Sequence, residues 1–331
     1  MAMTDGALTF AIPCRDGERH LPALLRSLLA QTVPCRLLLL DDASSDASVS
    51  VARAVAGDAL AVVRNDEALG IPGNWNRAAD LVGTEFFCLA HQDDVYAPEF
   101  GAAMLEALRC APDAAAAHCP ARAIDDEGRV LHSLPERYKA RFWRSLPPAE
   151  PPESGFRRLF GGNYVNCASL VYRRAAFVAV GRFDADFRFA PDWEWLLRAH
   201  AKGWRLAAVP HALVSYRRHP RQATQQAARS LRRYREEHAI LQSARAVGEG
   251  ILPQGGRSNA MRDNLLYDAF ADLEAGELGA ARDKLELLAE LDPRARRSAP
   301  ARAVATALRL GWPARKALSL ALSGYVGLVT R

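Results

Sequence analysis

Two pairs of adjacent aspartates follow apolar segments of the chain, at Asp41-Asp42 and at Asp93-Asp94. Neighbouring carboxylates repel each other, and the repulsion falls when a divalent cation lies between them and a phosphate group. Oxygen ligands of this kind suit Mg²⁺ or Mn²⁺, which usually bind through one or two carboxylates together with substrate phosphates. The two pairs therefore point to the metal-assisted departure of a phosphorylated leaving group.

The segments around these pairs alternate between strand and helix patterns. Short apolar runs predict strands at residues 8–12, 36–40, 59–63 and 85–90, and helical spacing predicts helices at residues 21–29, 48–56 and 73–82. Such alternation predicts an α/β fold with a mainly parallel sheet covered by helices. Ligands bind beyond the carboxyl ends of the strands in sheets of this kind, and both aspartate pairs lie there.

The chain is less regular from residue 96 to residue 222. Turn residues at 125–128 predict a hairpin between 114–124 and 129–132, and four prolines within residues 145–155 predict an irregular loop. A strand is expected at 168–172, followed by a helix at 193–201 that ends before Gly203.

A helical region is predicted from about residue 222 onward. Residues 265–292 resemble one helical hairpin of the tetratricopeptide type, turning at 276–279, but stacked repeats need about three units. No acidic residue follows Asp292, whereas eight basic residues do. Two interpretations stay open for this end of the chain: a basic helical cap on the core, or a helix on an anionic membrane surface.

Composition limits the function classes. The chain has 331 residues, 50% of them hydrophobic and 24% charged, with a formal net charge of +5. This balance is that of a globular protein, and its mild positive charge suits nucleotides or lipid headgroups; we expect no nucleic-acid partner. Six scattered cysteines, no signal peptide and a longest apolar run of about 14 residues, where a bilayer span needs about 20, predict a cytoplasmic protein with reduced thiols.

An ordered set of motifs runs from residue 7 to residue 222. Its pieces are Ile12-Pro13-Cys14-Arg15-Asp16, Ser27-Leu28-Leu29-x-Gln31-Thr32, Leu39-Leu40-Asp41-Asp42-Ala43-Ser44-Ser45-Asp46, Gly73-Asn74-Trp75-Asn76-Arg77, His91-Gln92-Asp93-Asp94, Gly181-x-Phe183-Asp184, Pro191-Asp192-Trp193-Glu194-Trp195 and Tyr216-Arg217-x-His219. In type and order these motifs resemble glycosyltransferase family 2. The resemblance implies a GT-A domain over residues 1–222, with a Rossmann-like nucleotide-binding half (1–95) and an acceptor-binding half (96–222), followed by a helical region (223–331).

The resemblance also implies a role for each matching position. Pro13, Glu18 and Asp42 would line the nucleoside pocket, with Asp42 on the base, and further contacts to the nucleotide sugar would come from Asn74, Arg77, Arg217 and His219. Asp93 would hold the Mg²⁺ or Mn²⁺ that bridges the diphosphate, with Asp94 beside it. The implied partners are a nucleotide-diphosphate sugar and a glycan or lipid-linked acceptor, with transfer on the cytoplasmic side of the membrane.

Asp192 falls where the family has its catalytic base, which deprotonates the acceptor hydroxyl and inverts the anomeric centre. Glu194 is a rival for that role, and Trp193 is expected near the acceptor. Trp193 and Trp195 cannot share one helix face, so one should pack inward while the other is free to stack on a sugar. His91 replaces the first aspartate of the family's Asp-x-Asp motif, either as a hydrogen-bonding residue at the strand end or as an added ligand.

Other functions remain as alternatives. A nucleotidyltransferase also uses a metal and two carboxylates, but normally has a glycine-rich basic loop after the first strand, where this chain has Pro13-Cys14-Arg15-Asp16-Gly17. A nicotinamide oxidoreductase would have G-x-G-x-x-G there, which is absent. A catalytically inactive sugar-nucleotide or carbohydrate-binding protein of the same fold also remains open.

Overall fold

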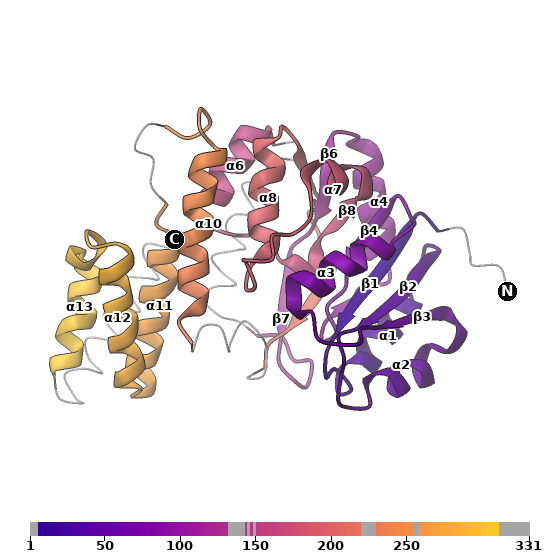
Figure 1. Ribbon diagram of the computed structural model, residues 1–331, viewed down its shortest axis with the longest axis horizontal. Coiled ribbons are helices and arrows are strands. Elements are labelled where there is room, and N and C mark those ends of the chain that lie inside the picture. Colours follow the sequence, from indigo (N-terminus) through magenta and orange to yellow (C-terminus); the bar gives the residue numbers. More distant parts are fainter. Residues whose placement is uncertain are drawn as a thin grey trace. The chain divides into compact units, whose positions relative to one another are not determined.

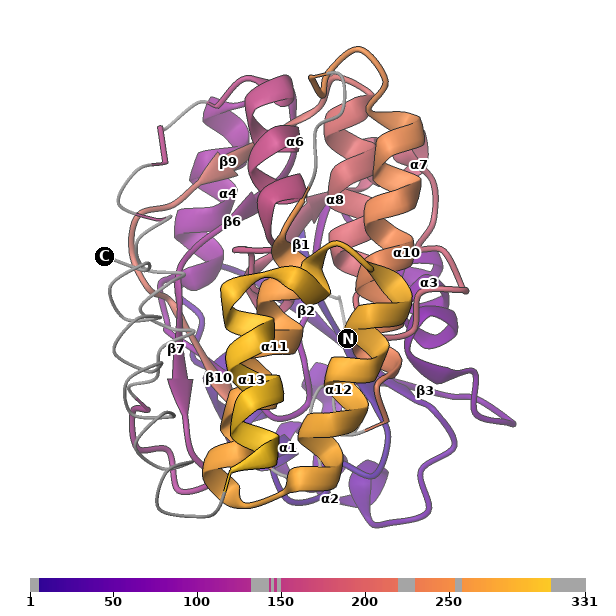
Figure 2. The same cartoon turned by 90° about the vertical axis from the view of Figure 1, so that its left-hand side faces the viewer.

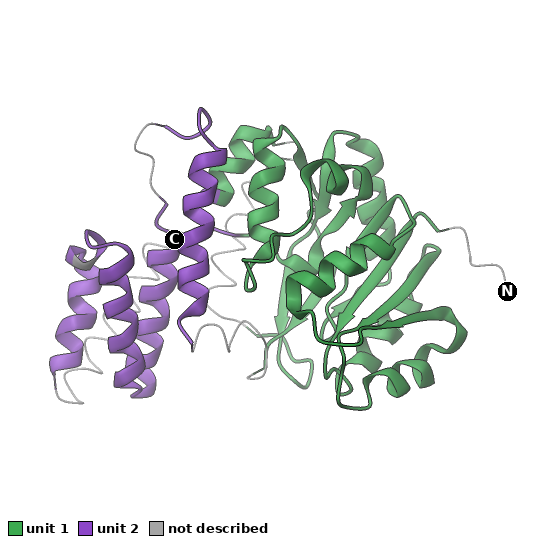
Figure 3. Ribbon diagram, viewed as in Figure 1, with its two compact units in different colours: residues 1–159, 164–219 green, residues 160–163, 220–331 purple. Residues whose placement is uncertain are grey.

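A computed structural model describes residues 6–131, 143, 146–147, 150–219, 230–253 and 258–310 of the chain (Figure 1). The chain divides into two compact units, which Figure 3 colours separately. Unit 1 comprises residues 1–159 and 164–219 and contains both sheets, whereas unit 2 comprises residues 160–163 and 220–331 and is helical.

The main sheet of unit 1 has seven strands among the described residues, in the order β3-β2-β1-β4-β8-β6-β9. Their bounds are β1 (Leu8–Cys14), β2 (Cys35–Asp41), β3 (Leu60–Arg64), β4 (Phe86–Leu89), β6 (Ala114–His118), β8 (Val171–Arg173) and β9 (Arg205–Ala208). β1 runs parallel to β2 and β4, and β2 runs parallel to β3, which confirms the predicted parallel half. β8 is antiparallel to both of its neighbours, so the sheet is mainly but not wholly parallel.

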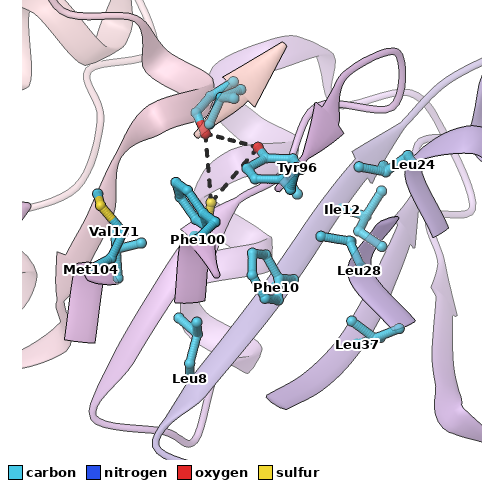
Figure 4. Close-up of a cluster of buried hydrophobic side chains, with 14 of the residues drawn as sticks. Leu8, Phe10, Ile12, Leu24, Leu28, Leu37, Tyr96, Phe100, Met104 and Val171 are labelled. Atoms are coloured by element: carbon cyan, nitrogen blue, oxygen red, sulfur yellow. Dashed lines mark hydrogen bonds between the residues drawn. The ribbon is translucent and has the colours of Figure 1, made fainter. Parts of the chain in front are cut away.

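One face of this sheet carries an aliphatic core under α1 (Leu21–Leu29), α2 (Ser48–Ala56) and α4 (Phe100–Cys110). Alternate residues of β1, namely Leu8, Phe10 and Ile12, point to this face, as the period of two in a strand requires. Figure 4 shows them beside Leu24 and Leu28 of α1 and Phe100 of α4. Burying each such side chain contributes about 1.5–3 kcal/mol, which fixes the register of β1 and with it the position of its carboxyl end.

The other face is covered by α3 (Gly70–Leu81), α7 (Arg174–Val180) and α8 (Pro191–Ala201) through an aromatic cluster. Its rings belong to Trp75, Phe87, Tyr172, Phe177, Phe183 and Trp195, with neighbouring centroids between 5.1 and 6.4 Å apart. Unit 1 is therefore a helix-sheet-helix sandwich, and α8, which carries Asp192, is anchored by aromatic packing.

A second sheet of three strands has the order β5-β10-β7 within the described residues. Its strands are β5 (Val95–Tyr96), β10 (Val214–Arg217) and β7 (Ala121–Ile124). β10 is antiparallel to β5, with Ser215 opposite Val95, and parallel to β7, with Arg217 opposite Ile124. This register brings residues 217–219 to the turn before β5, although more than 120 residues separate them in sequence.

Several boundaries differ from those expected. β1 continues through Pro13 instead of stopping there, residues 114–124 form β6 and β7 in different sheets, and Cys167–Ser169 is a 3-10 helix (η2) before β8. α6 (Pro152–Gly161) starts inside the proline-rich stretch expected to be a loop, because proline is well tolerated in the first turn of a helix. The expected turn at 125–128 is present, with Asp125 N donating to Arg129 O at 2.9 Å, while most of 145–149 and residue 132 lie outside the described residues.

Unit 2 contains α10 (Arg232–Val247), α11 (Ala260–Ala275), α12 (Leu278–Leu291), the 3-10 turn η3 (Ala295–Arg297) and α13 (Ala299–Arg309). α11 and α12 form the predicted hairpin, which turns at Gly276 with a left-handed φ of 83°. Figures 1 and 2 show α11, α12 and α13 side by side. No helix within the described part of the chain is long and apolar enough to cross a membrane.

Candidate active site

The turn from His91 to Asp94 joins the two sheets of unit 1. β4 ends at Leu89, Ala90 N still donates to Ala11 O of β1 at 2.8 Å, and Asp94 N closes the turn on His91 O at 3.2 Å. The turn therefore lies at the carboxyl ends of β1 and β4, the edge at which open α/β sheets bind ligands.

Asp93 of this turn faces His219. Its Oδ2 lies 3.1 Å from His219 Nε2, and each side chain is 16% exposed. Burial raises the pKa of the Asp93 carboxyl, but the hydrogen bond to His219 and the nearby His91 outweigh this, so the pKa falls below its usual value. Asp93 is thus an anionic oxygen donor at neutral pH, with a small part of its side chain exposed.

Asp94 is turned inward. It is 3% exposed, and its Oδ1 accepts a hydrogen bond of 2.9 Å from the backbone N–H of Arg217. Burial and the charge of Asp93 raise the pKa of Asp94 well above its usual value. We therefore assign Asp94 to fastening the turn to β10, and a direct contact between Asp94 and a metal stays a prediction.

Arg217, expected at the diphosphate, is 5% exposed and holds backbone carbonyls. Its Nε donates to Asp93 O at 3.1 Å, and its Nη1 donates to Asp125 O at 2.7 Å and to Asp126 O at 2.8 Å. The guanidinium therefore joins the acidic turn to the turn after β7.

His91 lies beside Trp75, with ring centroids 5.2 Å apart, and its Nδ1 is 4.0 Å from Asp94 Oδ2. Its Nε2 is buried and makes no hydrogen bond within the described residues. Burial lowers the pKa of His91 although the charge of Asp93 raises it, so the ring is neutral at pH 7. Both earlier interpretations of His91 remain open.

Three of the predicted contacts to the nucleotide sugar lie in a largely buried network centred on Asn65, namely Asp42, Asn74 and Arg77. Asn65 Nδ2 donates to Asp42 Oδ1 at 2.6 Å and to Asn74 Oδ1 at 3.0 Å, and Asn65 Oδ1 accepts from Arg77 Nη1. Asp42 also accepts from the backbone N–H groups of Leu69 at 2.8 Å and Gly70 at 3.0 Å. The structure thus brings Asp42, Asn74 and Arg77 together, and Asp42 fixes the loop that enters α3.

Pro13 and Glu18 precede Asp42 in the sequence. Pro13 lies in β1, and Glu18 lies in the loop that follows β1. Glu18 Oε2 accepts from Ala47 N at 3.0 Å, which joins this loop to the start of α2. Gln92 accepts from Arg15 N at 2.8 Å and donates to Arg15 O at 3.1 Å. Gln92 therefore couples the acidic turn to the loop after β1, a role that its sequence position alone did not indicate.

Asp192 lies in the first turn of α8 and is 5% exposed. A negative side chain there is favoured by the helix dipole. The thiol of Cys167 in η2 has a pKa raised by its own burial, then by the charge of Asp192 and, to a smaller extent, by that of Asp94. Cys167 therefore lies within electrostatic reach of both the acidic turn and the predicted base.

The neighbours of Asp192 are engaged in packing. Glu194 accepts from Arg198 Nε at 2.6 Å and from Arg198 Nη2 at 2.8 Å, which occupies both of its carboxylate oxygens. Trp193 and Trp195 are 2% and 0% exposed, and their indole N–H groups donate to Leu159 O and Gly181 O. Neither indole presents an open face for stacking in this conformation, so the acceptor contacts of Trp193 and Glu194 stay predictions.

The Asp93-His219 pair fits a hard divalent cation held mainly by a substrate. A bound cation would replace the proton that Asp93 Oδ2 and His219 Nε2 share at 3.1 Å, and this separation is close to the roughly 3 Å between neighbouring ligands of an octahedral ion at about 2.1 Å. No cluster of three or more metal-binding side chains occurs among the described residues. Two protein ligands are nevertheless enough for an ion whose remaining positions are filled by phosphate oxygens and water.

Comparisons with known proteins bear on the fold and on the family that the chain resembles. The family model described as Glycosyl transferase family 2 matches residues 9–168. The structure of residues 1–349 of S. aureus TarS resembles this chain with a TM-score of 0.54 at 15% identity, over 70% of this chain and 64% of TarS 1–349. Its complex with UDP-GlcNAc gives a TM-score of 0.53 at 16% identity, over 70% and 65%.

The mannosyltransferase PcManGT from Pyrobaculum calidifontis, solved with GDP-Man and Mn²⁺, resembles the chain over more of its length. The TM-score is 0.56 at 18% identity, over 96% of this chain and 86% of PcManGT. The chain spans less than two thirds of TarS 1–349, and no curated protein sequence matches it. At these identities the solved structures establish the fold, which is the GT-A fold, and residues 9–168 are similar to glycosyltransferase family 2.

Proposed function

We propose that the chain is a metal-dependent, inverting glycosyltransferase that moves a sugar from a nucleotide-diphosphate sugar to a hydroxyl group of a glycan or lipid-linked acceptor. The observation that carries this proposal is the Asp93-His219 pair, partly exposed at the carboxyl edge of the sheet, with Asp192 in the first turn of α8. TarS has been solved with UDP and UDP-GlcNAc, and PcManGT with GDP-Man and Mn²⁺, which supports a nucleotide-sugar donor here.

The donor would be bound by two groups of residues. The loop held by Asp42 and Asn65 and the loop after β1 form the nucleoside side, and Asp93 with His219 forms the diphosphate side. When bound, Mg²⁺ or Mn²⁺ supplies positive charge against the diphosphate as it leaves. Asp94 and Arg217 keep the Asp93 carboxylate in place through bonds that need no ligand.

Asp192 would act as the general base. It accepts the proton of the acceptor hydroxyl as that oxygen attacks the anomeric carbon, and the direct attack opposite the leaving diphosphate inverts the configuration. Glu194 is paired through both oxygens with Arg198, so service as the base would cost it these hydrogen bonds.

We also propose the division of labour along the chain. Residues 1–222 would form the catalytic domain, and the helical region 223–331 would recruit the enzyme to the cytoplasmic face of an anionic membrane. Four arginines of residues 293–310, at positions 294, 297, 302 and 309, are exposed, which supports the second assignment.

The test is to incubate the purified chain with a panel of UDP-, GDP-, ADP- and dTDP-sugars, with Mn²⁺, with Mg²⁺ or with a chelator. We expect metal-dependent release of one nucleoside diphosphate, lost in Asp93→Asn. Release of pyrophosphate from a nucleoside triphosphate and a sugar phosphate would instead identify a nucleotidyltransferase. Binding of a sugar nucleotide without any turnover across acceptors would identify an inactive binding protein.

A further inference from the structure

His20 and Asp126 lie behind His219, outside the set of residues that the family motifs indicate. The ring centroids of His20 and His219 are 5.3 Å apart, and the two planes meet at 41°. His20 Nε2 lies 3.3 Å from Asp126 Oδ1. The side chains of His20 and Asp126 are 12% and 23% exposed and those of His219 and Asp93 are each 16% exposed, so all four residues of the row Asp126, His20, His219, Asp93 are partly buried.

The backbone of both His20 and Asp126 is held by hydrogen bonds. His20 immediately precedes α1, and its carbonyl accepts from Ala23 N at 3.0 Å and from Leu24 N at 3.3 Å. The carbonyl of Asp126 accepts from Arg217 Nη1 at 2.8 Å, and Arg217 also holds the Asp93 carbonyl. The first loop, the turn after β7 and the end of β10 therefore meet at the ring of His219.

His219 needs such support because it lies two residues beyond the end of β10. A histidine side chain on an irregular segment has two free torsions, and a metal site loses affinity when its ligand is not held in one orientation. The ring of His20 packs against that of His219, and Asp126 Oδ1, which makes no hydrogen bond within the described residues, faces His20 Nε2 at 3.3 Å.

We propose that His20 and Asp126 are positioning residues that hold the His219 imidazole against Asp93 and thereby set the affinity of the site for a divalent cation and the diphosphate that it carries. The inference rests on the proposed function, because it takes the Asp93-His219 pair to be the metal-diphosphate site. It adds two residues from distant parts of the sequence to that site.

The experiment titrates Mn²⁺ into the full-length chain at saturating UDP or GDP, whichever the wild type binds, and follows binding by calorimetry. Asp126→Asn and His20→Phe should raise the half-saturating Mn²⁺ concentration about 10- to 100-fold, as is typical for residues that orient metal ligands. His20→Phe keeps an aromatic ring beside His219 and removes both ring nitrogens, including the Nε2 that faces Asp126. Turnover at saturating Mn²⁺ should stay close to that of the wild type, so the change appears in the metal requirement and not in kcat.

Arg19→Gln is the matched control. Arg19 Nη2 also lies near Asp126, at 3.2 Å, but its side chain is 54% exposed, and Arg19 makes no contact with His219 among the interactions found in the described residues. This variant should bind Mn²⁺ as the wild type does. Equal weakening by Arg19→Gln would show that charge balance around Asp126, and not the orientation of His219, sets the affinity, and would overturn the proposal.

A double-mutant cycle tests whether Asp126 acts through His219. In a His219→Ala background, the further change Asp126→Asn should weaken Mn²⁺ binding by less than about twofold, because the ring to be positioned is gone. A full 10- to 100-fold further loss, or wild-type affinity in both Asp126→Asn and His20→Phe, would overturn the inference while leaving the proposed function intact. A wild-type chain without any Mn²⁺-dependent nucleotide binding would overturn both.

Discussion

Asn65 donates one hydrogen bond of 2.6 Å to Asp42 and so holds the carboxylate that fastens the loop before α3. The same amide reaches Asn74 at 3.0 Å, and its oxygen accepts from Arg77. A single side chain, 2% exposed, thus connects three residues whose motifs lie in two separate parts of the sequence.

Replacing Asn65 should therefore damage both stability and donor binding. In Asn65→Ala, Arg77 loses its bond to Asn65, and Asp42 keeps only its backbone partners Leu69 and Gly70; each lost hydrogen bond costs about 0.5–1.5 kcal/mol. We expect a lower thermal unfolding midpoint and a weaker nucleotide affinity, measured by thermal shift with and without UDP or GDP. The control is Asn76→Ala. Asn76 lies in α3 and makes hydrogen bonds with the backbone of Phe183 instead of with Asp42 or Arg77. This variant should lower the midpoint without a comparable change in nucleotide affinity.

Asp93→Asn should remove metal-dependent turnover. The substitution keeps the size of the side chain but takes away the negative charge that, with His219, would hold the cation. We expect turnover to fall by at least about 100-fold and the response to added Mn²⁺ to disappear. Asp94→Asn is the informative comparison, because Asp94 is buried and its Oδ1 accepts from Arg217 N. Because the asparagine oxygen can still accept from Arg217 N, the Asp94→Asn variant should keep its fold and lose less metal response than Asp93→Asn, and the reverse order of metal response would exchange their roles.

Asp192→Asn should separate chemistry from donor binding. Loss of a general base lowers turnover by about 10²- to 10⁴-fold, while nucleotide binding should stay nearly unchanged. Glu194→Gln should instead lower the unfolding midpoint, because it weakens the paired hydrogen bonds to Arg198. Steady-state kinetics and thermal shift on both variants decide the assignment: if Glu194→Gln loses more turnover than Asp192→Asn, the base is Glu194.

The stability of the chain should depend on two buried histidines. His118 and His200 are 1% and 2% exposed, and burial lowers the pKa of His118 to about 3 and that of His200 to about 4. In the unfolded chain both titrate near pH 6.5. Between these values the unfolded state binds more protons than the folded state, so the free energy of unfolding falls as the pH falls below about 6.5.

With both residues titrating, the expected slope near pH 5 is about 2.7 kcal/mol per pH unit, twice the value for one group. Denaturant unfolding from pH 7 to pH 4.5 measures it. His200→Gln should reduce the slope by about half, whereas His211→Gln, at an exposed position, should leave it unchanged. A slope that is the same in all three proteins would show that other groups cause the acid sensitivity.

Local sequence patterns predicted the parallel half of the main sheet, from β1 to β4, whose strands and helices pack against elements close in sequence. The strands around β1 and the helices α1 and α2 follow from apolar periodicity, since each buries one face against a neighbour close in sequence. The pairing of Asp93 with His219 could be placed only loosely, because it depends on the antiparallel register of β5 and β10. Asn65, Gln92 and Asp126 were not predicted as part of the site. The sequence pattern of a polar residue after a strand is the same whether its side chain faces solvent or contacts another loop.

Membrane binding by the basic region after Asp292 is best tested by substituting its arginines and not by deleting the region. α13 buries Ala301, Val304 and Ala307 and contacts α11 and α12, so removing it would expose the core of unit 2. Changing the exposed Arg294, Arg302 and Arg309 to glutamine keeps that packing and removes three charges. Each basic residue near an anionic surface contributes about 1 kcal/mol, so binding to phosphatidylserine-containing vesicles should fall by about 100-fold in total.

The control changes Arg26, Arg53 and Arg109, three exposed arginines of unit 1, to glutamine and should bind vesicles as the wild type does. Equal loss in both variants would mean that net charge attracts the vesicles, and no loss in either would leave the basic region as a helical cap.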